Sequence, residues 1–142
     1  MKVIYKTKVT TSGGRNGVAK SEDGVLNLEL SMPKELGGPG GAKTNPEQLF
    51  AAGYSACFEN ALRFIGAGKG LEVSNASVTC EVGFALSGTA KLLTAALDVS
   101  LPDMPQDAAL ALTMEAHGLC PYSRAINGNI DVPITVNGET LT

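Results

Sequence analysis

The 142-residue chain lacks the features that several large functional classes need. Its net charge is −3 and its eleven basic residues form no run or stripe, which excludes a nucleic-acid-binding footprint. Three cysteines are too few, and odd in number, for a disulfide-stapled scaffold. A single histidine with scattered cysteines does not make a zinc site, so no metal is expected. GxSxG elbows, P-loops and dinucleotide fingerprints are also absent.

Targeting and membrane segments are likewise missing from the sequence. The segment Met1–Lys6 has no apolar core and no small-residue cleavage site, so a cytoplasmic location is the default expectation. The most apolar stretch, residues 46–65, contains Glu47, Glu59 and Arg63, which favours a helix buried in protein over a membrane span. Length, ordinary apolar content and the absence of a linker predict one domain over residues 1–142.

The first third of the chain is predicted to be strands and turns. A strand is expected over residues 2–10, and Gly13-Gly14 with Asn16-Gly17 marks a turn. Residues 18–22 and 25–31 are typical of a hairpin, because leucines alternate with polar residues in the second arm. The loop at 33–44 is rich in glycine and proline and is interpreted as a mobile flap.

A helix boundary follows at Asn45-Pro46-Glu47-Gln48. Asn45 suits the N-cap, Pro46 the first helical position, and Gln48 the third position of a capping box. The helix is predicted to end near residue 65, before Gly66 and Gly68. Because it is apolar almost all round, we expect a central helix covered on most sides.

The second half predicts a sheet and two more helices. Strands are expected at 76–86 and 92–101, a helix at 105–118, and a short helix opened by Pro121 with Cys120 near its N-cap. The last strand, 130–136, contains Pro133, which indicates an edge strand. This order predicts the α+β class with an antiparallel sheet.

The three cysteines lie in different predicted surroundings. Cys80 falls on the apolar face of a strand and is expected in the core. Cys57 lies three turns into the apolar helix, and its surroundings alone fit a small buried side chain. Cys120 lies at a helix break, where a side chain can be exposed and can meet backbone N–H groups that favour a thiolate. His117, three residues earlier, leaves a Cys–His pair open.

Three segments carry a family resemblance that spans nearly the whole chain. They are residues 45–58 (NPEQLFAAGYSACF), residues 116–123 (AHGLCPYS), and the early pair 13–17 and 21–24. The sequence resembles the organic hydroperoxide resistance proteins of the OsmC/Ohr superfamily. Asn16 stands where the family usually has an aspartate, and both residues form turns. The resemblance implies an OsmC-like fold, with an antiparallel sheet wrapped around a central buried helix in an intertwined homodimer.

The same resemblance implies residue roles. Cys57 would attack the peroxide, Cys120 would resolve the product as a disulfide, and Arg15 and Glu47 would be the active-site arginine and glutamate. The implied activity is thiol-dependent reduction of organic hydroperoxides to alcohols in the response to oxidative stress. Dihydrolipoamide or a lipoylated protein would be the reductant, and no bound cofactor, metal, haem or flavin is required.

Elementary chemistry supports these roles independently. A thiolate is the nucleophile, but a thiol with a pKa near ~8.5 is mostly protonated at neutral pH, and burial raises that pKa further. A cation must therefore offset the burial of Cys57, and Arg15 could do so while donating hydrogen bonds to the peroxide oxygens. Glu47 could hold Arg15 through a bidentate pair.

Spacing adds an expectation about assembly. Glu47 and Cys57 are ten residues apart on one predicted helix, about 15 Å along its axis at ~1.5 Å per residue. We therefore predict that Arg15 and Glu47 serve Cys57 of the partner subunit. Apolar residues beside Cys57, namely Phe50, Tyr54 and Phe58, favour bulky alkyl or fatty-acyl hydroperoxides over hydrogen peroxide.

Three other interpretations stay open from the sequence. An OsmC-type peroxidase induced by osmotic stress would share the chemistry and differ in regulation. A redox-responsive binding protein would use Cys57 and Cys120 only to sense oxidants. A structural domain with inert cysteines would use neither.

Overall fold

The computed structural model describes residues 1–141, which form two compact units, one at residues 1–49 and a second that begins at Phe50. Its strands and helices confirm the predicted α+β class. The single domain over residues 1–142 stays a prediction. In the described part of the chain, no helix is long and apolar enough to cross a membrane.

The first unit is a three-stranded antiparallel sheet with two short 3-10 helices. Its strands are β1 (Val9–Ser12), β2 (Val18–Ser21) and β3 (Asn27–Glu29), and its 3-10 helices are η1 (Gly14–Asn16) and η2 (Lys34–Leu36). The hairpin predicted at 18–22 and 25–31 is confirmed with shorter arms. The strand predicted at 2–10 is wrong, because residues 1–8 form no strand and β1 begins only at Val9. Good β-formers make a strand only where a neighbouring strand is present to pair with them.

Helix α1 (Pro46–Gly68) begins where the sequence predicts. The Gln48 N–H donates to the Asn45 Oδ1 at 2.8 Å, which confirms Asn45 as the N-cap. The Gln48 side chain does not complete the expected capping box; it accepts a hydrogen bond from Thr44 Oγ1 at 2.9 Å. The helix runs past the predicted end near 65, because Gly66 does not end it. Gly66 instead makes room for close packing, since a Cβ there would lie 2.6 Å from the Val73 side chain.

The second unit contains a four-stranded sheet in the order β4-β5-β6-β7. Strands β4 (Ser77–Ser87) and β5 (Ala90–Ser100) form a long antiparallel hairpin, as predicted. The strand predicted at 130–136 is shorter: β6 (Ile134–Val136) begins after Pro133 and pairs in parallel with β5. It is not the edge strand either, since β7 (Glu139–Thr140) pairs beyond it. The Pro133 carbonyl accepts a hydrogen bond from Leu97 N–H, so the proline contributes only its acceptor.

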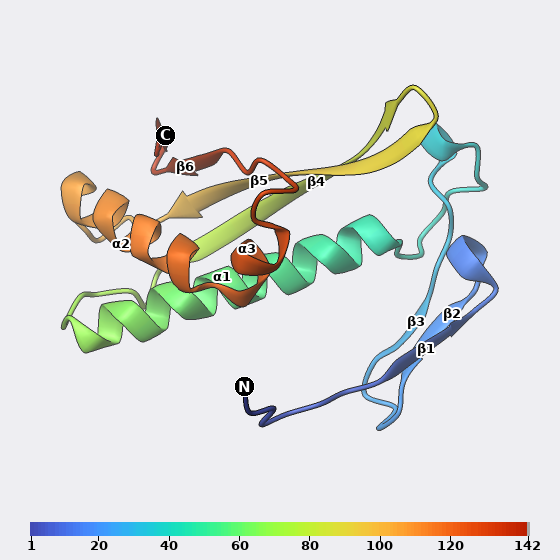
Figure 1. Ribbon diagram of the computed structural model, residues 1–142, viewed down its shortest axis with the longest axis horizontal. Helices are drawn as coiled ribbons and strands as arrows, with labels where there is room; N and C mark the ends of the chain where they lie inside the picture. The colour runs from blue at the N-terminus through green and yellow to red at the C-terminus, as the bar shows by residue number, and fades with distance from the viewer. Residues whose placement is uncertain (142) are drawn as a thin grey trace. The chain divides into compact units, whose positions relative to one another are not determined.

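Helices α2 (Gln106–Leu119) and α3 (Pro121–Ile126) confirm the two helices predicted there. Alternate residues of β5 pack with α1 and α2 in one core, so both helices lie on the same face of the sheet (Figure 1). The largest fully buried side chains of this core are Tyr54, Phe58, Leu62, Leu97, Leu101 and Leu112.

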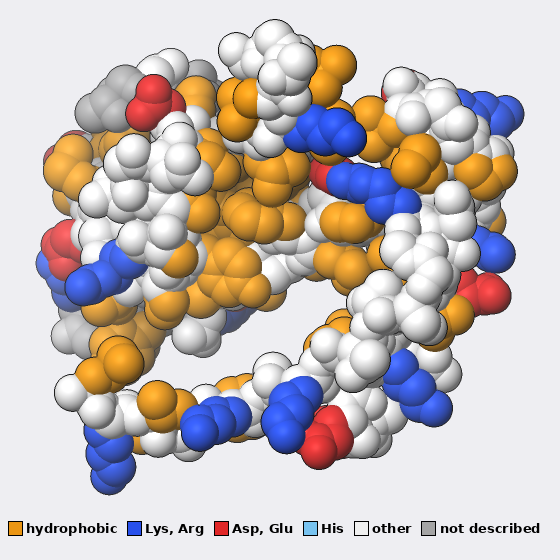
Figure 2. Space-filling view, turned by 45° about the vertical axis from the view of Figure 1, so that its right-hand side comes forward, with side chains coloured by type: hydrophobic (Ala, Val, Ile, Leu, Met, Phe, Trp, Pro, Cys, Tyr) orange, Lys and Arg blue, Asp and Glu red, His pale blue; other side chains and the backbone are white. Residues whose placement is uncertain are grey.

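The prediction that α1 is covered on most sides is wrong for the single chain. Its buried residues lie on one face: Tyr54, Phe58, Ala61, Leu62 and Gly66. Phe64, on the same helix, is 72% exposed. Large hydrophobic side chains also remain exposed elsewhere on the chain, as the orange surface in Figure 2 shows. An apolar helix pattern predicts that the helix is buried without specifying what covers it, so part of α1 is open in the single chain.

Candidate active site

Arg15 and Glu47 form a bidentate ion pair in the first unit. Arg15 Nη1 donates to Glu47 Oε2 at 2.8 Å, and Nη2 donates to Oε1 at 2.6 Å. The pair is partly shielded, with side-chain exposures of 26% and 12%. This two-point contact matches the pairing predicted from the sequence and fixes the plane of the guanidinium.

Local backbone geometry presents Arg15 from a tight turn. It lies in η1, which begins after Gly13, a residue with φ of 79°, in the left-handed region that glycine adopts freely. A Cβ on Gly17, the residue that ends η1, would overlap the Ser12 carbonyl oxygen. The two glycines are therefore steric requirements of the turn that holds the arginine.

The ion pair keeps both groups charged. Hydrogen bonding from Arg15 lowers the pKa of Glu47, and the same bond raises the pKa of Arg15. Glu47 also lies in the first turn of α1, where a negative charge is favoured by the helix dipole. The result is a fixed cation held on a charged carboxylate.

Cys57 lies on α1 and is half-buried. Burial raises the pKa of its thiol most, and the charge and hydrogen bond of Cys120 raise it further. A hydrogen bond from the Tyr122 backbone N–H acts in the opposite direction and lowers the pKa of Cys57. Cys57 packs against the core that contains Cys120, and the balance of these effects raises the pKa of Cys57 above its ordinary value.

Cys120 occupies the junction between α2 and α3. It is the C-cap of α2 and the N-cap of α3, with Pro121 at the first position of α3, as predicted. Its N–H donates to the Ala116 carbonyl at 2.8 Å. The expectation that this side chain is exposed is wrong, since Cys120 is fully buried in the core. A helix break exposes a side chain only when nothing packs over it, and α1 packs over this one.

Aromatic rings belong to the same core as the two thiols. Tyr54 stacks on Tyr122 with ring centres 5.9 Å apart, and Phe50 meets both rings edge-on at 6.2 Å and 6.3 Å. Gly53 makes room for this packing, because a Cβ there would lie 2.5 Å from the Tyr122 hydroxyl. Of the three apolar residues that the sequence places beside Cys57, Tyr54 and Phe58 are fully buried, and the preference for bulky hydroperoxides stays a prediction. Phe50 and Tyr122 keep exposed surface.

The two residues without an assigned role also have definite places. Cys80 is half-buried on β4 against the core, as predicted, and burial raises its pKa. His117 hydrogen-bonds to Ser123, with its Nδ1 3.0 Å from Ser123 Oγ. Sequence reasoning missed Tyr122 and Ser123, whose only signal is their place directly after Cys120-Pro121.

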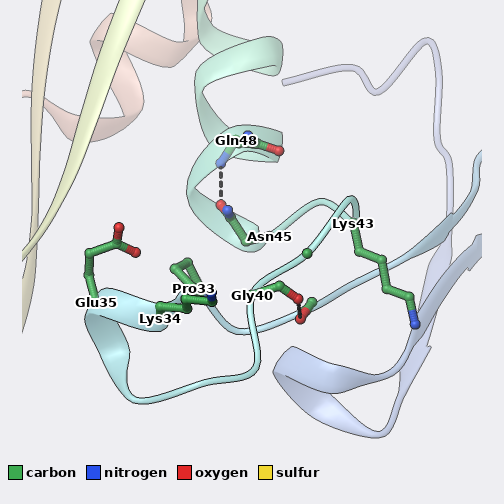
Figure 3. Close-up of a pocket in the computed structure, with 9 residues that line it drawn as sticks. Pro33, Lys34, Glu35, Gly40, Lys43, Asn45 and Gln48 are labelled. Carbon is green, nitrogen blue, oxygen red and sulfur yellow. Dashed lines mark hydrogen bonds between the residues drawn. The ribbon is translucent and has the colours of Figure 1, made fainter.

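The glycine-rich loop before α1 folds back on itself. Ser31 Oγ donates to the Gly40 carbonyl at 2.7 Å, and Gly40 N–H donates to the Met32 carbonyl at 3.0 Å. Between the loop and the start of α1 is a cavity of about 270 Å³ (Figure 3). Its walls include Lys34, Glu35, Lys43 and the capping residue Asn45. That the loop moves as a flap stays a prediction.

The four predicted site residues thus form two pairs. Arg15 and Glu47 are bonded to each other in the first unit, and Cys57 packs against the core that contains Cys120 in the second. That the first pair serves a Cys57 thiolate stays a prediction, as do the catalytic roles themselves. Among residues 1–141, no three His, Cys, Asp or Glu side chains gather as metal ligands would.

Comparison with known proteins places the chain in a family. Residues 38–135 match the model of the OsmC-like protein family. The organic hydroperoxide resistance protein-like 2 of Staphylococcus saprophyticus is 45% identical over 139 residues, covering 96% of this chain and 98% of the relative.

Two solved structures extend the likeness to the fold. An organic hydroperoxide resistance protein from Legionella pneumophila superposes with a TM-score of 0.90 at 46% identity, covering 95% of this chain and 98% of that one. A putative organic hydroperoxide resistance protein from Vibrio cholerae, with captopril bound in one of its active sites, gives a TM-score of 0.93 at 45% identity. The match covers 99% of this chain and 96% of that one. The chain therefore belongs to the OsmC-like family, among the organic hydroperoxide resistance proteins.

Proposed function

We propose that this protein is a cysteine-based peroxidase that reduces organic hydroperoxides to alcohols. The observation that carries the proposal is that Cys57, on α1, packs against the core that contains Cys120, at the start of α3. Two thiols in one core, together with aromatic rings, are what a two-cysteine peroxide reductase needs. The names of the relatives, which refer to organic hydroperoxide resistance, support the same substrate class.

The reaction begins at Cys57. Its thiolate attacks the outer oxygen of the hydroperoxide, a sulfur–oxygen bond forms, the O–O bond breaks, and the leaving alkoxide takes a proton to become the alcohol. Cys57 is left as a sulfenic acid. Cys120 sulfur then displaces the hydroxide, which leaves as water with the Cys120 proton, and a disulfide forms. An external dithiol restores both thiols by exchange and is itself oxidised to a disulfide.

The Arg15–Glu47 pair would supply the positive charge that stabilises the Cys57 thiolate. Burial and Cys120 both raise the pKa of Cys57, so an isolated chain disfavours the reactive thiolate. A fixed guanidinium beside the sulfur would lower that pKa and would donate hydrogen bonds to the leaving alkoxide. Glu47 keeps the guanidinium oriented through two hydrogen bonds.

A homodimer would bring the two pairs together. Glu47 and Cys57 lie ten residues apart on the continuous helix α1, about 15 Å at ~1.5 Å per residue. The chain also exposes apolar side chains that a second copy could cover, among them Ile4 at 89% and Phe64 at 72%. The Vibrio cholerae relative has more than one active site, in agreement with a symmetric assembly. Sedimentation of fully active protein as a monomer would contradict this part of the proposal.

Organic hydroperoxides suit the surface that remains near the cysteines. The partly exposed ring of Phe50 meets Tyr54 and Tyr122 edge-on, and the partly exposed Tyr122 stacks on the fully buried Tyr54. Such an apolar wall favours alkyl or fatty-acyl groups over hydrogen peroxide. The family resemblance favours dihydrolipoamide, free or on a lipoylated protein, as the reductant.

One assay tests the proposal. Purified protein is given cumene hydroperoxide and dihydrolipoamide, and peroxide consumption is followed for the wild type, Cys57→Ser and Cys120→Ser, with Cys80→Ser as the matched control. We expect turnover by the wild type and by Cys80→Ser, and none by the other two. A wild type that consumes no peroxide would sink the enzyme proposal, and an active Cys57→Ser would sink the site assignment. Oxidation of Cys57 without turnover would favour an oxidant sensor.

A further inference from the structure

A hydrogen-bond network lies in the core close to the cysteines, and the cycle proposed above assigns it no role. The Tyr54 hydroxyl is 2.8 Å from Ser123 Oγ, and the same oxygen is 3.0 Å from His117 Nδ1. Tyr54 is fully buried and Ser123 is 3% exposed. A hydroxyl offers one donor and two acceptor positions, so Ser123 can satisfy both neighbours at once.

This hydrogen-bond network joins the three helices that carry or flank the two thiols. Tyr54 lies on α1, three residues before Cys57. His117 lies in the last turn of α2, and Ser123 is the third residue of α3. The Ser123 hydroxyl thus bridges the break between α2 and α3 and ties it to the helix that carries Cys57.

Cys120 sits inside this bridge. It lies between His117 and Ser123 in sequence, its N–H donates to the Ala116 carbonyl, and its carbonyl accepts from Arg124 N–H at 3.0 Å. The helix it caps has only six residues, too few to hold its place without tertiary contacts. The position of the Cys120 sulfur therefore depends on what fixes the first turn of α3.

We propose that Ser123, bonded to Tyr54 and His117, is a positioning residue that holds Cys120 in line with Cys57 and so sets the rate of disulfide formation. This inference rests on the proposed peroxidase function. A disulfide forms only within a narrow range of sulfur and Cβ geometry. Cys120 is fully buried and cannot reach Cys57 by a free search, so the hydrogen-bonded turn must present it.

The step affected is the second one of the cycle. Cys120 sulfur attacks the sulfur of the Cys57 sulfenic acid, the S–S bond forms, the S–O bond breaks, and hydroxide leaves with the Cys120 proton as water. The first step, attack of Cys57 on the peroxide, needs no movement of Cys120. Loss of the bridge should therefore slow the second step and spare the first.

The two steps can be separated with dimedone, which traps a sulfenic acid before it forms a disulfide. Reduced full-length protein is mixed with one equivalent of cumene hydroperoxide, quenched with dimedone at increasing times, and the Cys57 peptide is examined by mass spectrometry. Wild type should pass quickly to the disulfide, and Cys120→Ser should accumulate the adduct. Ser123→Ala should form the disulfide between about tenfold and a hundredfold more slowly, because small misplacement of reacting atoms costs that much. Its peroxide consumption in the first turnover should match the wild type.

Conservative variants distinguish positioning from general loss of structure. Ser123→Thr keeps the hydroxyl and should restore fast disulfide formation. Tyr54→Phe removes one hydroxyl but keeps the ring that stacks on Tyr122, and it should show the slow second step with a normal first step. Ser87→Ala, at an exposed position at the end of β4, is the matched control and should behave as wild type.

The outcomes are decisive for each proposal separately. If Ser123→Ala and Tyr54→Phe both form the disulfide at the wild-type rate, the positioning role is wrong. If Ser123→Ala does not fold, Tyr54→Phe alone decides. If both steps slow together in Tyr54→Phe, the network is merely structural and the inference is overturned. If Cys120→Ser shows no adduct on Cys57, the peroxidase proposal itself fails.

Discussion

Individual residues in this protein are held by short, specific contacts whose removal has distinct consequences. Arg15 is fixed by two hydrogen bonds to Glu47. Burial and Cys120 raise the pKa of Cys57, and the Tyr122 backbone lowers it. The sequence predicted the first pairing because a motif match placed an arginine and a glutamate together. It could not predict the Tyr122 contact, since a backbone N–H has no sequence signature.

The reactivity of Cys57 should depend on Arg15. In a Cys80→Ser, Cys120→Ser background only Cys57 can be alkylated, and its rate with iodoacetamide follows the thiolate fraction. With Arg15 present we expect a midpoint below the ordinary thiol pKa of ~8.5, because a cation favours the charged form. Arg15→Ala should move the midpoint above that value, since burial raises the pKa of Cys57 more than the Tyr122 backbone lowers it and the cation is gone. Equal midpoints in both proteins would mean that Arg15 does not reach Cys57.

Gly53 should be required for the aromatic packing beside the thiols. A Cβ there would lie 2.5 Å from the Tyr122 hydroxyl and 3.0 Å from its Cζ, so Gly53→Ala must displace that ring. Because the Tyr122 backbone lowers the pKa of Cys57, displacement of this residue should slow alkylation of Cys57 and alter the near-UV circular dichroism spectrum. Gly68→Ala, in the same helix with open space around it, is the control and should change neither.

At the scale of elements, local signals explain which boundaries the sequence predicted well. The start of α1 and the break at Cys120-Pro121 depend on side chains within a few residues, and both are confirmed. The failures are non-local. Residues 1–8 have strand-forming side chains but no neighbouring strand to pair with. Strand β6 begins at Ile134 and not at 130, because its pairing with β5 begins only at Ile134. Pairing partners far along the chain cannot be deduced from local alternation.

The cap of α1 should contribute measurably to stability. Asn45 Oδ1 accepts the Gln48 N–H, and loss of such a cap costs about 1 kcal/mol. Asn45→Ala should lower the free energy of unfolding in urea by that amount without changing the slope of the transition. Asn45→Asp keeps an accepting oxygen and should stay close to the wild type. An unchanged midpoint in Asn45→Ala would show that another group caps the helix.

At the scale of the whole molecule, the single chain exposes large apolar side chains. Val3, Ile4 and Tyr5 are 58%, 89% and 78% exposed. The sequence of helix α1 predicts burial on most sides, yet its buried residues lie on one face. A sequence pattern does not distinguish burial within one chain from burial against a second copy, and the proposed homodimer would account for the difference.

The central claim is that Cys57 becomes reactive through Arg15 and Glu47 of a second copy of the chain. Mixing two inactive variants, Cys57→Ser and Arg15→Ala, tests it most directly. After subunit exchange, half of the dimers are mixed, and one site in each combines an intact Cys57 with an intact Arg15. We expect recovery of about a quarter of the wild-type peroxidase activity with cumene hydroperoxide and dihydrolipoamide, as a symmetric dimer with shared sites requires. A mixture that stays inactive after exchange has been verified would contradict it.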